Sequence, residues 1–200
     1  MVRAAWVLLA VLGFGAVPRT DEEGFVPLFD RDHLQDWVQC GPGSFKVEDG
    51  VATGVGGMGL WYYRKKMFAD FEWRGEFQQE KGPKSDSGIF VRFPDPGDDP
   101  WIAVKQGHEI EIGDPTPSPK STASIYSFHG PTELPLKPLG EWNAVAIACT
   151  GKRYRVHLNG KLITDWTDTA DRPLKGYVGI QNFPWPGAVR HRNVRIKELP

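Results

Sequence analysis

The sequence predicts an all-β fold, a jelly-roll sandwich of two antiparallel sheets. Residues 68–78 alternate between apolar and polar side chains, as a long half-buried antiparallel strand does. The pairs Asp49-Gly50 and Asn159-Gly160 each join two strand-like segments, and both favour the tight turn of a β-hairpin. About a dozen such segments follow one another without a stretch of helical periodicity, which indicates a two-sheet sandwich.

The expected strands are short and separated by turn-forming residues. In chain order they cover residues 45–48, 51–53, 60–63, 68–78, 87–93, 108–112, 123–128, 142–150, 154–158, 161–166, 176–181 and 189–199. Loops are expected where glycine or proline is frequent, at residues 54–59, 94–100, 115–119 and 131–140. No internal repeat or linker divides the chain, so these strands belong to one domain.

Length and composition limit the class of protein. Two hundred residues suit one domain with a full core. Eight Trp, eleven Phe and five Tyr residues with 23 Gly and 17 Pro favour many strands joined by tight turns over long helices. A formal net charge of −1 and the lack of a basic stripe argue against nucleic acid as a partner.

The start of the chain resembles a secretory signal peptide. One positive charge at Arg3 precedes a short apolar run over residues 4–15, and small residues near its end offer cleavage positions. The run is too short for a comfortable membrane span. We expect a signal peptide over 1–17, a spacer over 18–24 and a folded domain over 25–200, secreted or periplasmic and not inserted in a membrane. An uncleaved anchor is the alternative.

Cys40 and Cys149 are the only cysteines. In an exported protein they would be able to pair, although sequence alone does not show that they are close. Cys149 shares strand parity with Val145 and Ile147, which suits a buried free thiol. The absence of a Cys-x-x-Cys spacing argues against a zinc site.

Two acidic residues on one strand face form the centre of the candidate site. Along residues 108–112, Glu109 and Glu111 share one face, whereas Ile110 and Ile112 share the other. Two carboxylates side by side repel each other, and one of them usually has a raised pKa. Such a pair is typical of sites that bind a cation or perform acid–base chemistry.

The strand over residues 87–93 supplies a basic residue to the same site. Arg92 shares a strand face with Gly88 and Phe90, and Ser87 lies on the opposite face. A guanidinium next to two carboxylates would make a charged floor for a groove. The alternative is an Arg–Glu ion pair on a solvated sheet face.

A series of short motifs resembles the 3-keto-disaccharide hydrolase domain family from about Phe25 to the C-terminus. The motifs are, in order, Leu28-Phe29-Asp30, residues 34–37, residues 45–50, Asp70-Phe71-Glu72, residues 87–92, residues 109–112 with Asp114, Ser124-Ile125-Tyr126, residues 140–143, Asn159-Gly160, residues 179–182 and residues 192–197. Each motif alone is weak, but their order together is fairly specific.

The resemblance implies a concanavalin-like jelly roll with a concave sheet facing carbohydrate, and activity on sugars oxidised at carbon 3. The sequence departs from the family in two places. The family usually has Tyr before the first Glu and Gln two residues after it, where this chain has His108 and Glu111. The family often has His-Gly after Gln-Asp or Gln-Asn, where this chain has Phe183-Pro184-Trp185-Pro186 after Asn182.

The implied reaction assigns a catalytic role to three residues. A carbonyl at carbon 3 acidifies the hydrogen on carbon 2, so a base removes that proton, the glycosidic oxygen leaves carbon 1, and water adds afterwards. Glu109 is the expected base, and Arg92 or a bound cation would stabilise the enolate. Glu111 or His108 would be auxiliary, although His108 shares parity with Ile110 and is expected to lie in the core.

Two other functions stay open. Glu109, Glu111 and Asp114 resemble the acidic strand motif of laminarinase-type retaining glycoside hydrolases, although Asp114 before Pro115 is more often a turn residue. A carbohydrate-binding module without catalysis would stack sugar rings on exposed aromatic side chains. The candidates for stacking are Trp61, Tyr62, Trp101, Tyr126 and Trp185, whereas Trp37, Trp73 and Trp142 suit the core.

The expected ligand is a carbohydrate. The residues assigned to substrate binding are Ser87, Tyr126, Gln181, Trp101 and Trp185. No cofactor and no metal ligands are predicted. The acidic pair with Asp114 would supply oxygen ligands of the type that Ca²⁺ takes, so calcium is the alternative, although the chain has no Asp-rich calcium loop.

Overall fold

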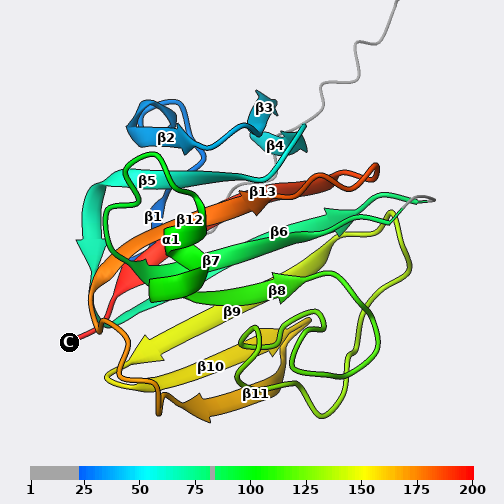
Figure 1. The fold of residues 1–200 in the computed structure, drawn as a ribbon. Coiled ribbons are helices and arrows are strands. Elements are labelled where there is room, and N and C mark those ends of the chain that lie inside the picture. Colours follow the sequence, from blue (N-terminus) through cyan, green and yellow to red (C-terminus); the bar gives the residue numbers. More distant parts are fainter. Residues whose placement is uncertain (1–22, 82–83) are drawn as a thin grey trace, which may run out of the picture.

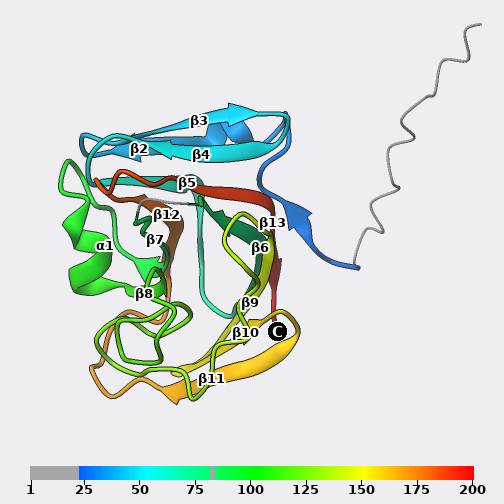
Figure 2. The same ribbon diagram turned by 90° about the vertical axis from the view of Figure 1, so that its right-hand side faces the viewer.

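The computed structural model describes residues 23–81 and 84–200, and it confirms the predicted sandwich of two antiparallel sheets (Figure 1). The expected signal peptide and most of the expected spacer lie outside the described residues. Figure 2 shows the two sheets as facing layers, with a short helix on the outer side of one of them.

The larger sheet has eight strands. Its order is β11 (Lys161–Thr167), β10 (Arg153–Leu158), β9 (Asn143–Thr150), β6 (Phe71–Gln79), β13 (Val189–Glu198), β4 (Val51–Val55) and β3 (Ser44–Glu48), with β1 (Val26–Pro27) paired to β13. The predicted hairpin turns at Asp49-Gly50 and Asn159-Gly160 connect β3 to β4 and β10 to β11. Both Asp49 and Asn159 have a φ of +50°, the left-handed conformation that such turns require.

The smaller sheet has five strands and carries the candidate site. Its order is β2 (Trp37–Cys40), β5 (Gly59–Phe68), β12 (Gly176–Asn182), β7 (Ser87–Phe93) and β8 (His108–Ile112). A 3₁₀ turn, η1 (Leu34–Asp36), precedes β2, and helix α1 (Trp101–Gln106) joins β7 to β8. Because β8 is at the edge of this sheet, its outer side is open to the loops that follow it.

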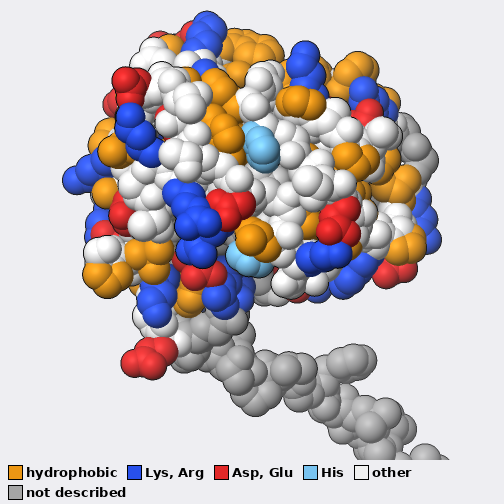
Figure 3. Space-filling model, turned by 90° about the horizontal axis from the view of Figure 1, so that it is seen from below, with side chains coloured by type: hydrophobic (Ala, Val, Ile, Leu, Met, Phe, Trp, Pro, Cys, Tyr) orange, Lys and Arg blue, Asp and Glu red, His pale blue; other side chains and the backbone are white. Residues whose placement is uncertain are grey.

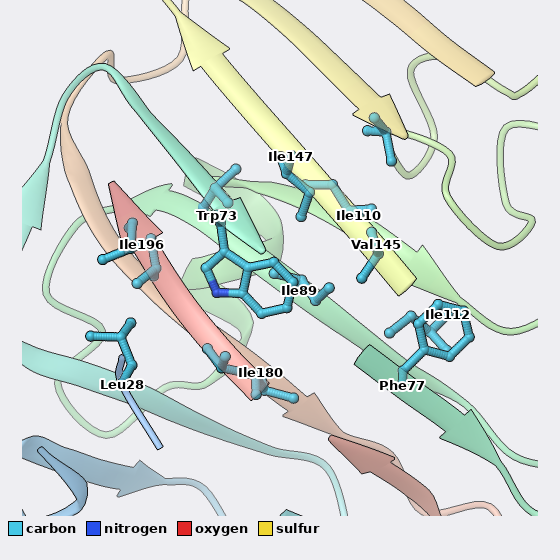
Figure 4. Close-up of a cluster of buried hydrophobic side chains, with 14 of the residues drawn as sticks. Leu28, Trp73, Phe77, Ile89, Ile110, Ile112, Val145, Ile147, Ile180 and Ile196 are labelled. Atoms are coloured by element: carbon cyan, nitrogen blue, oxygen red, sulfur yellow. The ribbon is translucent and has the colours of Figure 1, made fainter. Parts of the chain in front are cut away.

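Apolar side chains from both sheets meet in one core (Figure 4). Trp73, Ile147 and Ile196 come from the larger sheet, and Ile89 and Ile110 come from the smaller one. The alternation that predicted a strand over residues 68–78 places every second side chain of β6 in this core. Removing this apolar surface from water is the main driving force for packing the two sheets together.

A β-bulge in β7 overturns the predicted orientation of Arg92. Tyr177 pairs with Phe93 and Val178 pairs with Val91, so Arg92 is an extra residue without a partner in β12. Arg92 has a φ of +55°, which turns its side chain away from the outer face and in between the two sheets. The prediction that Arg92 contributes to the floor of a groove with the two glutamates is therefore wrong.

Arg92 instead anchors the loops at one end of the sandwich. Its fully buried side chain donates hydrogen bonds to the carbonyl oxygens of Ala69 (2.8 Å) and Gly151 (2.5 Å) and to the hydroxyl of Tyr154 (3.2 Å). It also forms an ion pair with Asp70 at 3.0 Å. The bulge thus connects the smaller sheet to the turns before β6 and after β9.

Two local predictions are wrong. Residues 123–128 form turns rather than a strand, with positive φ values at Ala123 (61°) and Ser127 (65°). These turns cover the edge of β8, where the N–H of Tyr126 donates to the carbonyl of Glu109 at 2.9 Å. Helix α1 was not expected, because six residues are too few to show helical periodicity.

Both cysteines are free and buried. Cys149 lies in the core between the sheets, as its strand parity predicted, and Cys40 lies with Ala103 of α1 on the outer side of the smaller sheet. The two thiols therefore belong to different clusters, and the disulfide considered from the sequence does not form.

Charged side chains of both signs lie on the surface, as the low net charge of the chain suggests. Figure 3 shows one face on which basic, acidic and apolar side chains are interspersed. Among residues 23–81 and 84–200, no helix has the length and apolar character needed to cross a membrane.

We predict that Arg92→Met destabilises the protein by about 3 kcal/mol, because it leaves Asp70 and the carbonyl oxygens of Ala69 and Gly151 without their buried donor. Urea unfolding at pH 7 measures this change. Arg153→Met is the matched control, since Arg153 is exposed and pairs with Asp165 at the surface, where an ion pair contributes little. Equal stabilities of the two variants would contradict the anchoring role of Arg92.

Candidate functional site

The candidate site lies on the outer face of the smaller sheet, where three strands run side by side. Gly88 of β7 pairs with Glu111 of β8. Gln181 of β12 lies on the other side of Gly88, because it is one residue beyond the Ile180–Ile89 pair. The next row, closer to α1, contains Phe90 paired with Glu109. Strand parity therefore directs both glutamates to one face, as the sequence predicted, and it directs Gln181 to the same face.

Two glycines provide the space for the acidic side chains. A Cβ atom on Gly88 would overlap the carboxyl group of Glu109, so this carboxyl lies directly over Gly88. A Cβ atom on Gly113 would lie 2.8 Å from Glu111 Oε1 and 3.3 Å from Asp86 Oδ2. The carboxyl groups of Glu111 and Asp86 therefore approach each other over Gly113, and any larger residue at either glycine would displace them.

A pocket of about 190 Å³ opens above these groups. Its lining combines the acidic floor with side chains from α1, from the turns after β8 and from the residue after β12. The lining residues are Asp86, Trp101, Val104, Glu109, Glu111, Lys120, Tyr126, Gln181 and Phe183. The floor is polar and the walls are largely aromatic or aliphatic, as is typical of small-molecule sites.

Burial raises the pKa values of all three acids, and neighbouring acids raise those of the two glutamates further. Burial raises the pKa of Glu109 above its ordinary range, with a further contribution from Asp86. Burial, Glu109 and Asp86 together raise the pKa of Glu111. The pKa of Asp86 is raised to about 6 by burial, against the opposing effects of Lys84 and a hydrogen bond from Trp185. The cluster therefore retains at least one proton at neutral pH, and Asp86, whose pKa is raised least, is the first of the three acids to ionise.

Two buried oxygen atoms of the site have no hydrogen-bond partner in the protein. They are Glu109 Oε1 and Gln181 Oε1, on side chains that are each only 4% exposed. Buried polar atoms are normally paired, so unpaired atoms in a pocket are typical of groups that await a ligand.

The structure brings together five of the eight predicted site residues. Glu109, Glu111, Tyr126, Gln181 and Trp101 all line the pocket. Arg92, Ser87 and Trp185 do not line it. Ser87 lies on the core face, where its hydroxyl donates to the carbonyl of Gln181 at 2.7 Å and lies 3.1 Å from His191 Nε2.

Trp185 supports the site from outside the pocket. Its side chain opposes the rise in the pKa of the Asp86 carboxyl group, and Lys84 Nζ lies 4.6 Å from the centre of its ring. Ser85 pairs with Gly187 in an isolated bridge next to these residues. Of the other aromatic residues considered for sugar stacking, Trp61 and Tyr62 are buried.

Sequence reasoning missed four lining residues. Asp86 lies outside the strands expected from the sequence, although its position directly before Ser87-Gly88 is a usable signal for a third acid. Lys120 comes from a turn that returns to β8, and Phe183 continues the outward parity of Gln181. Val104 belongs to α1.

His108 and Asp114 lie away from the chemistry. His108 is fully buried on the core face, as its parity predicted, and its Nε2 lies 3.1 Å from Asp168 Oδ2. Burial lowers the pKa of His108 to about 4, although Asp168 opposes this shift. Asp114 is exposed and accepts a hydrogen bond from the N–H of Thr116 at 2.7 Å, which is the geometry of a turn residue.

The acids of the pocket offer oxygen atoms of the type that Ca²⁺ prefers. In the described part of the chain, however, no group of three or more His, Cys, Asp or Glu side chains is arranged to hold a metal ion. Calcium binding stays a prediction from the sequence, and the chemistry below uses only groups of the protein.

Comparisons with known proteins agree with this fold. A family model described as the 3-keto-alpha-glucoside-1,2-lyase-like domain matches residues 24–197. Two structures of a "putative glycosyl hydrolase" from Parabacteroides distasonis align with TM-scores of 0.73 and 0.72 at 22% and 19% identity. The first alignment covers 88% of this chain and 99% of that one, and the second covers 89% and 95%.

The carbohydrate-binding module CBM66 from Bacillus subtilis also has this fold, with a TM-score of 0.61 and 14% identity over 82% of this chain and 96% of that one. At these identities the structural neighbours show the fold alone. No curated protein sequence gives a significant match to the chain.

We predict that Glu111→Gln flattens the pH dependence of stability. Because the pKa of Glu111 is raised in the folded protein, its contribution is complete below the unfolded pKa and is lost as pH rises through the folded pKa. Between pH 6.5 and 8.5 the wild type should therefore lose about 1–3 kcal/mol more than the variant. Urea unfolding across this range measures the difference.

This pH window avoids the buried histidines. Burial lowers the pKa of His108 to about 4 and that of His191 to about 3, so both are neutral in the folded protein and largely neutral in the unfolded chain above pH 6.5. Glu133→Gln is the control, because Glu133 is exposed and pairs with Lys161. Parallel profiles for wild type and Glu111→Gln would mean that Glu111 is ionised throughout.

Proposed function

The chain belongs to the 3-keto-alpha-glucoside-1,2-lyase-like domain family, and on this premise we propose that it cleaves the glycosidic bond of 3-keto-glucosides by elimination followed by hydration. The family and the fold support a carbohydrate-related function. The residues of the pocket support the specific reaction, because this elimination needs an acid and a base close together and the cluster supplies several carboxyl groups that exchange protons near neutral pH.

One observation carries the proposal: three carboxyl groups with raised pKa values converge on an open pocket with the unpaired oxygen atom of Gln181. A structural ion-pair network would bring basic partners to the acids. Here the ionic partner of Arg92 is Asp70 on the other side of the sheet, and the two lysines near the acids in the described part of the chain, Lys84 and Lys120, form no ion pair with them. The protein therefore keeps a costly cluster of buried acids, which is typical of functional sites.

The proposed reaction begins with proton transfer to Glu109. The carbonyl at carbon 3 acidifies the hydrogen on carbon 2, and the carboxylate of Glu109 takes this proton. The electron pair of the broken C–H bond forms the enolate, then the double bond between carbons 1 and 2, as the glycosidic C–O bond breaks and its pair stays with the leaving oxygen. Water adds across the double bond in a second step and gives the free 3-keto sugar.

Two further residues complete the reaction. Glu111, whose pKa is raised by burial and by its acidic neighbours, retains a proton at neutral pH and donates it to the leaving oxygen. The hydroxyl of Tyr126 stays protonated, because burial and the two glutamates raise its pKa. It donates a hydrogen bond to the enolate oxygen, which replaces the role that the sequence assigned to Arg92.

A carbohydrate-binding module is the second candidate, because Trp101 is 43% exposed at the edge of the pocket. A retaining glycoside hydrolase has less support. Asp114, the third acid of the laminarinase-like motif, is an exposed turn residue outside the pocket.

We predict that the wild-type protein cleaves a 3-keto-glucoside and leaves the matching unoxidised glucoside intact, since only the ketone makes the hydrogen on carbon 2 acidic enough for a carboxylate. Glu109→Gln keeps the shape of the side chain but removes its basicity, and it should lower kcat by about 10²–10⁴-fold. Product release followed by chromatography or NMR measures both activities.

Glu133→Gln serves as a control that removes an exposed carboxylate and leaves the pocket untouched. Full activity of Glu109→Gln would remove Glu109 from the mechanism. Cleavage of the unoxidised glucoside would favour the retaining mechanism, and binding without cleavage of either sugar would favour the binding module.

A further inference from the structure

We propose that Trp101 and Val104 of α1 form a subsite for an aromatic leaving group, so that aryl-substituted 3-keto-glucosides are the preferred substrates. This inference rests on the proposed function for its choice of substrate. It adds to that function the chemical class of the group on carbon 1 and the surface that receives this group.

The apolar wall of the pocket lies on one face of α1. Trp101 and Val104 are three residues apart, so they are neighbours on the helix surface. Both line the pocket, and Trp101 is 43% exposed. An indole that borders the pocket and also extends outside it matches a group that is attached to a sugar ring but lies beyond it.

Trp185, the other exposed tryptophan in the described part of the chain, already contacts other side chains of the protein. The ring of Trp185 lies 5.9 Å from the ring of Phe183 and 4.6 Å from Lys84 Nζ, and its side chain opposes the rise in the pKa of Asp86. Trp185 does not line the pocket, whereas Trp101 does. Of the two exposed tryptophans in the described part of the chain, the one on α1 is therefore the one available to a ligand in the pocket.

Hydrogen bonds and a buried side chain fix the position of helix α1, although it has only six residues. The N–H of Trp101 donates to Asp99 Oδ1 at 3.0 Å. Arg172 donates to the carbonyl of Val104 at 2.9 Å and also to the carbonyl of Gly107. Ala103 is fully buried against the smaller sheet. A surface fixed in this way loses little conformational entropy when a ligand stacks on it.

The distribution of polar atoms favours an aromatic group over a second sugar. The pocket volume of about 190 Å³ is below the roughly 300–1,000 Å³ of sites that enclose drug-sized ligands, so it suits a single sugar ring. The acids and Gln181 that would bind its hydroxyl groups lie on the floor. The wall on α1 offers an indole and an isopropyl group, which contact a flat apolar ring well but leave the hydroxyl groups of a second sugar unsatisfied.

The test compares benzyl and ethyl 3-keto-glucosides, whose leaving alcohols have similar acidity but differ in the aromatic ring. One aromatic contact corresponds to about a 2- to 12-fold effect. The kcat/KM of the wild type should therefore be about 2- to 12-fold higher for the benzyl substrate than for the ethyl substrate. Trp101→Ala should bring the ratio close to one, and Trp101→Phe should retain part of it. Leu139→Ala, which shortens an exposed side chain outside the pocket lining, should leave the ratio unchanged.

A binding measurement separates this inference from the proposed function. Calorimetry with Glu109→Gln determines the Kd of both intact sugars, with and without Trp101→Ala. Tighter binding of the benzyl sugar that depends on Trp101 supports the subsite even if the wild type cleaves neither sugar, an outcome that would overturn only the proposed function. Equal Kd values and equal kcat/KM values for the two sugars would overturn the subsite, whether or not both are cleaved.

Discussion

The candidate site depends on holding three carboxyl groups close together on the outer face of a sheet with little access to water. Gly88 and Gly113 leave the space that the carboxyl groups fill, and the turns after β8 cover the sheet edge next to Glu109 and Glu111. Ionised carboxylates at such distances repel each other, so the cluster retains protons that free acids would release. This one constraint places an acid and a base in the same pocket.

The bulge at Arg92 keeps a positive charge away from the three carboxyl groups, and it also strengthens the contact between the two sheets. An arginine facing Glu109 would stabilise the ionised carboxylates and lower their pKa values. The extra residue in β7 turns the guanidinium to the core side, where it binds Asp70 and the carbonyl oxygens of Ala69 and Gly151. The same residue therefore connects the smaller sheet to the turns of the larger one and leaves the acidic cluster without a strong counter-charge.

The sequence predicts the parts of this structure that follow from strand periodicity. The alternation in β6 predicts a half-buried strand, and parity in β8 directs Glu109 and Glu111 outward and His108 inward. Strand parity predicts the wrong orientation for Arg92, because the sequence does not mark the bulge. The one glycine within residues 87–93 is Gly88, which lies before the bulge, and this segment has no proline. Asp86 and Trp101 reach the pocket through a turn and a short helix, and neither placement has a periodic signal.

The central claim is that the protein removes the hydrogen on carbon 2, and the most direct test is to run the reaction in D₂O and to analyse the product by NMR. Elimination followed by hydration places a solvent deuteron on carbon 2 of the released 3-keto sugar during turnover. Uncatalysed exchange next to the ketone is subtracted with a sample of the free sugar kept in D₂O for the same time. Our account predicts one deuterium at carbon 2 in excess of that background. A product that keeps its original hydrogen on carbon 2, together with an unchanged rate for a substrate deuterated at carbon 2, would show direct displacement at carbon 1 and would contradict the account.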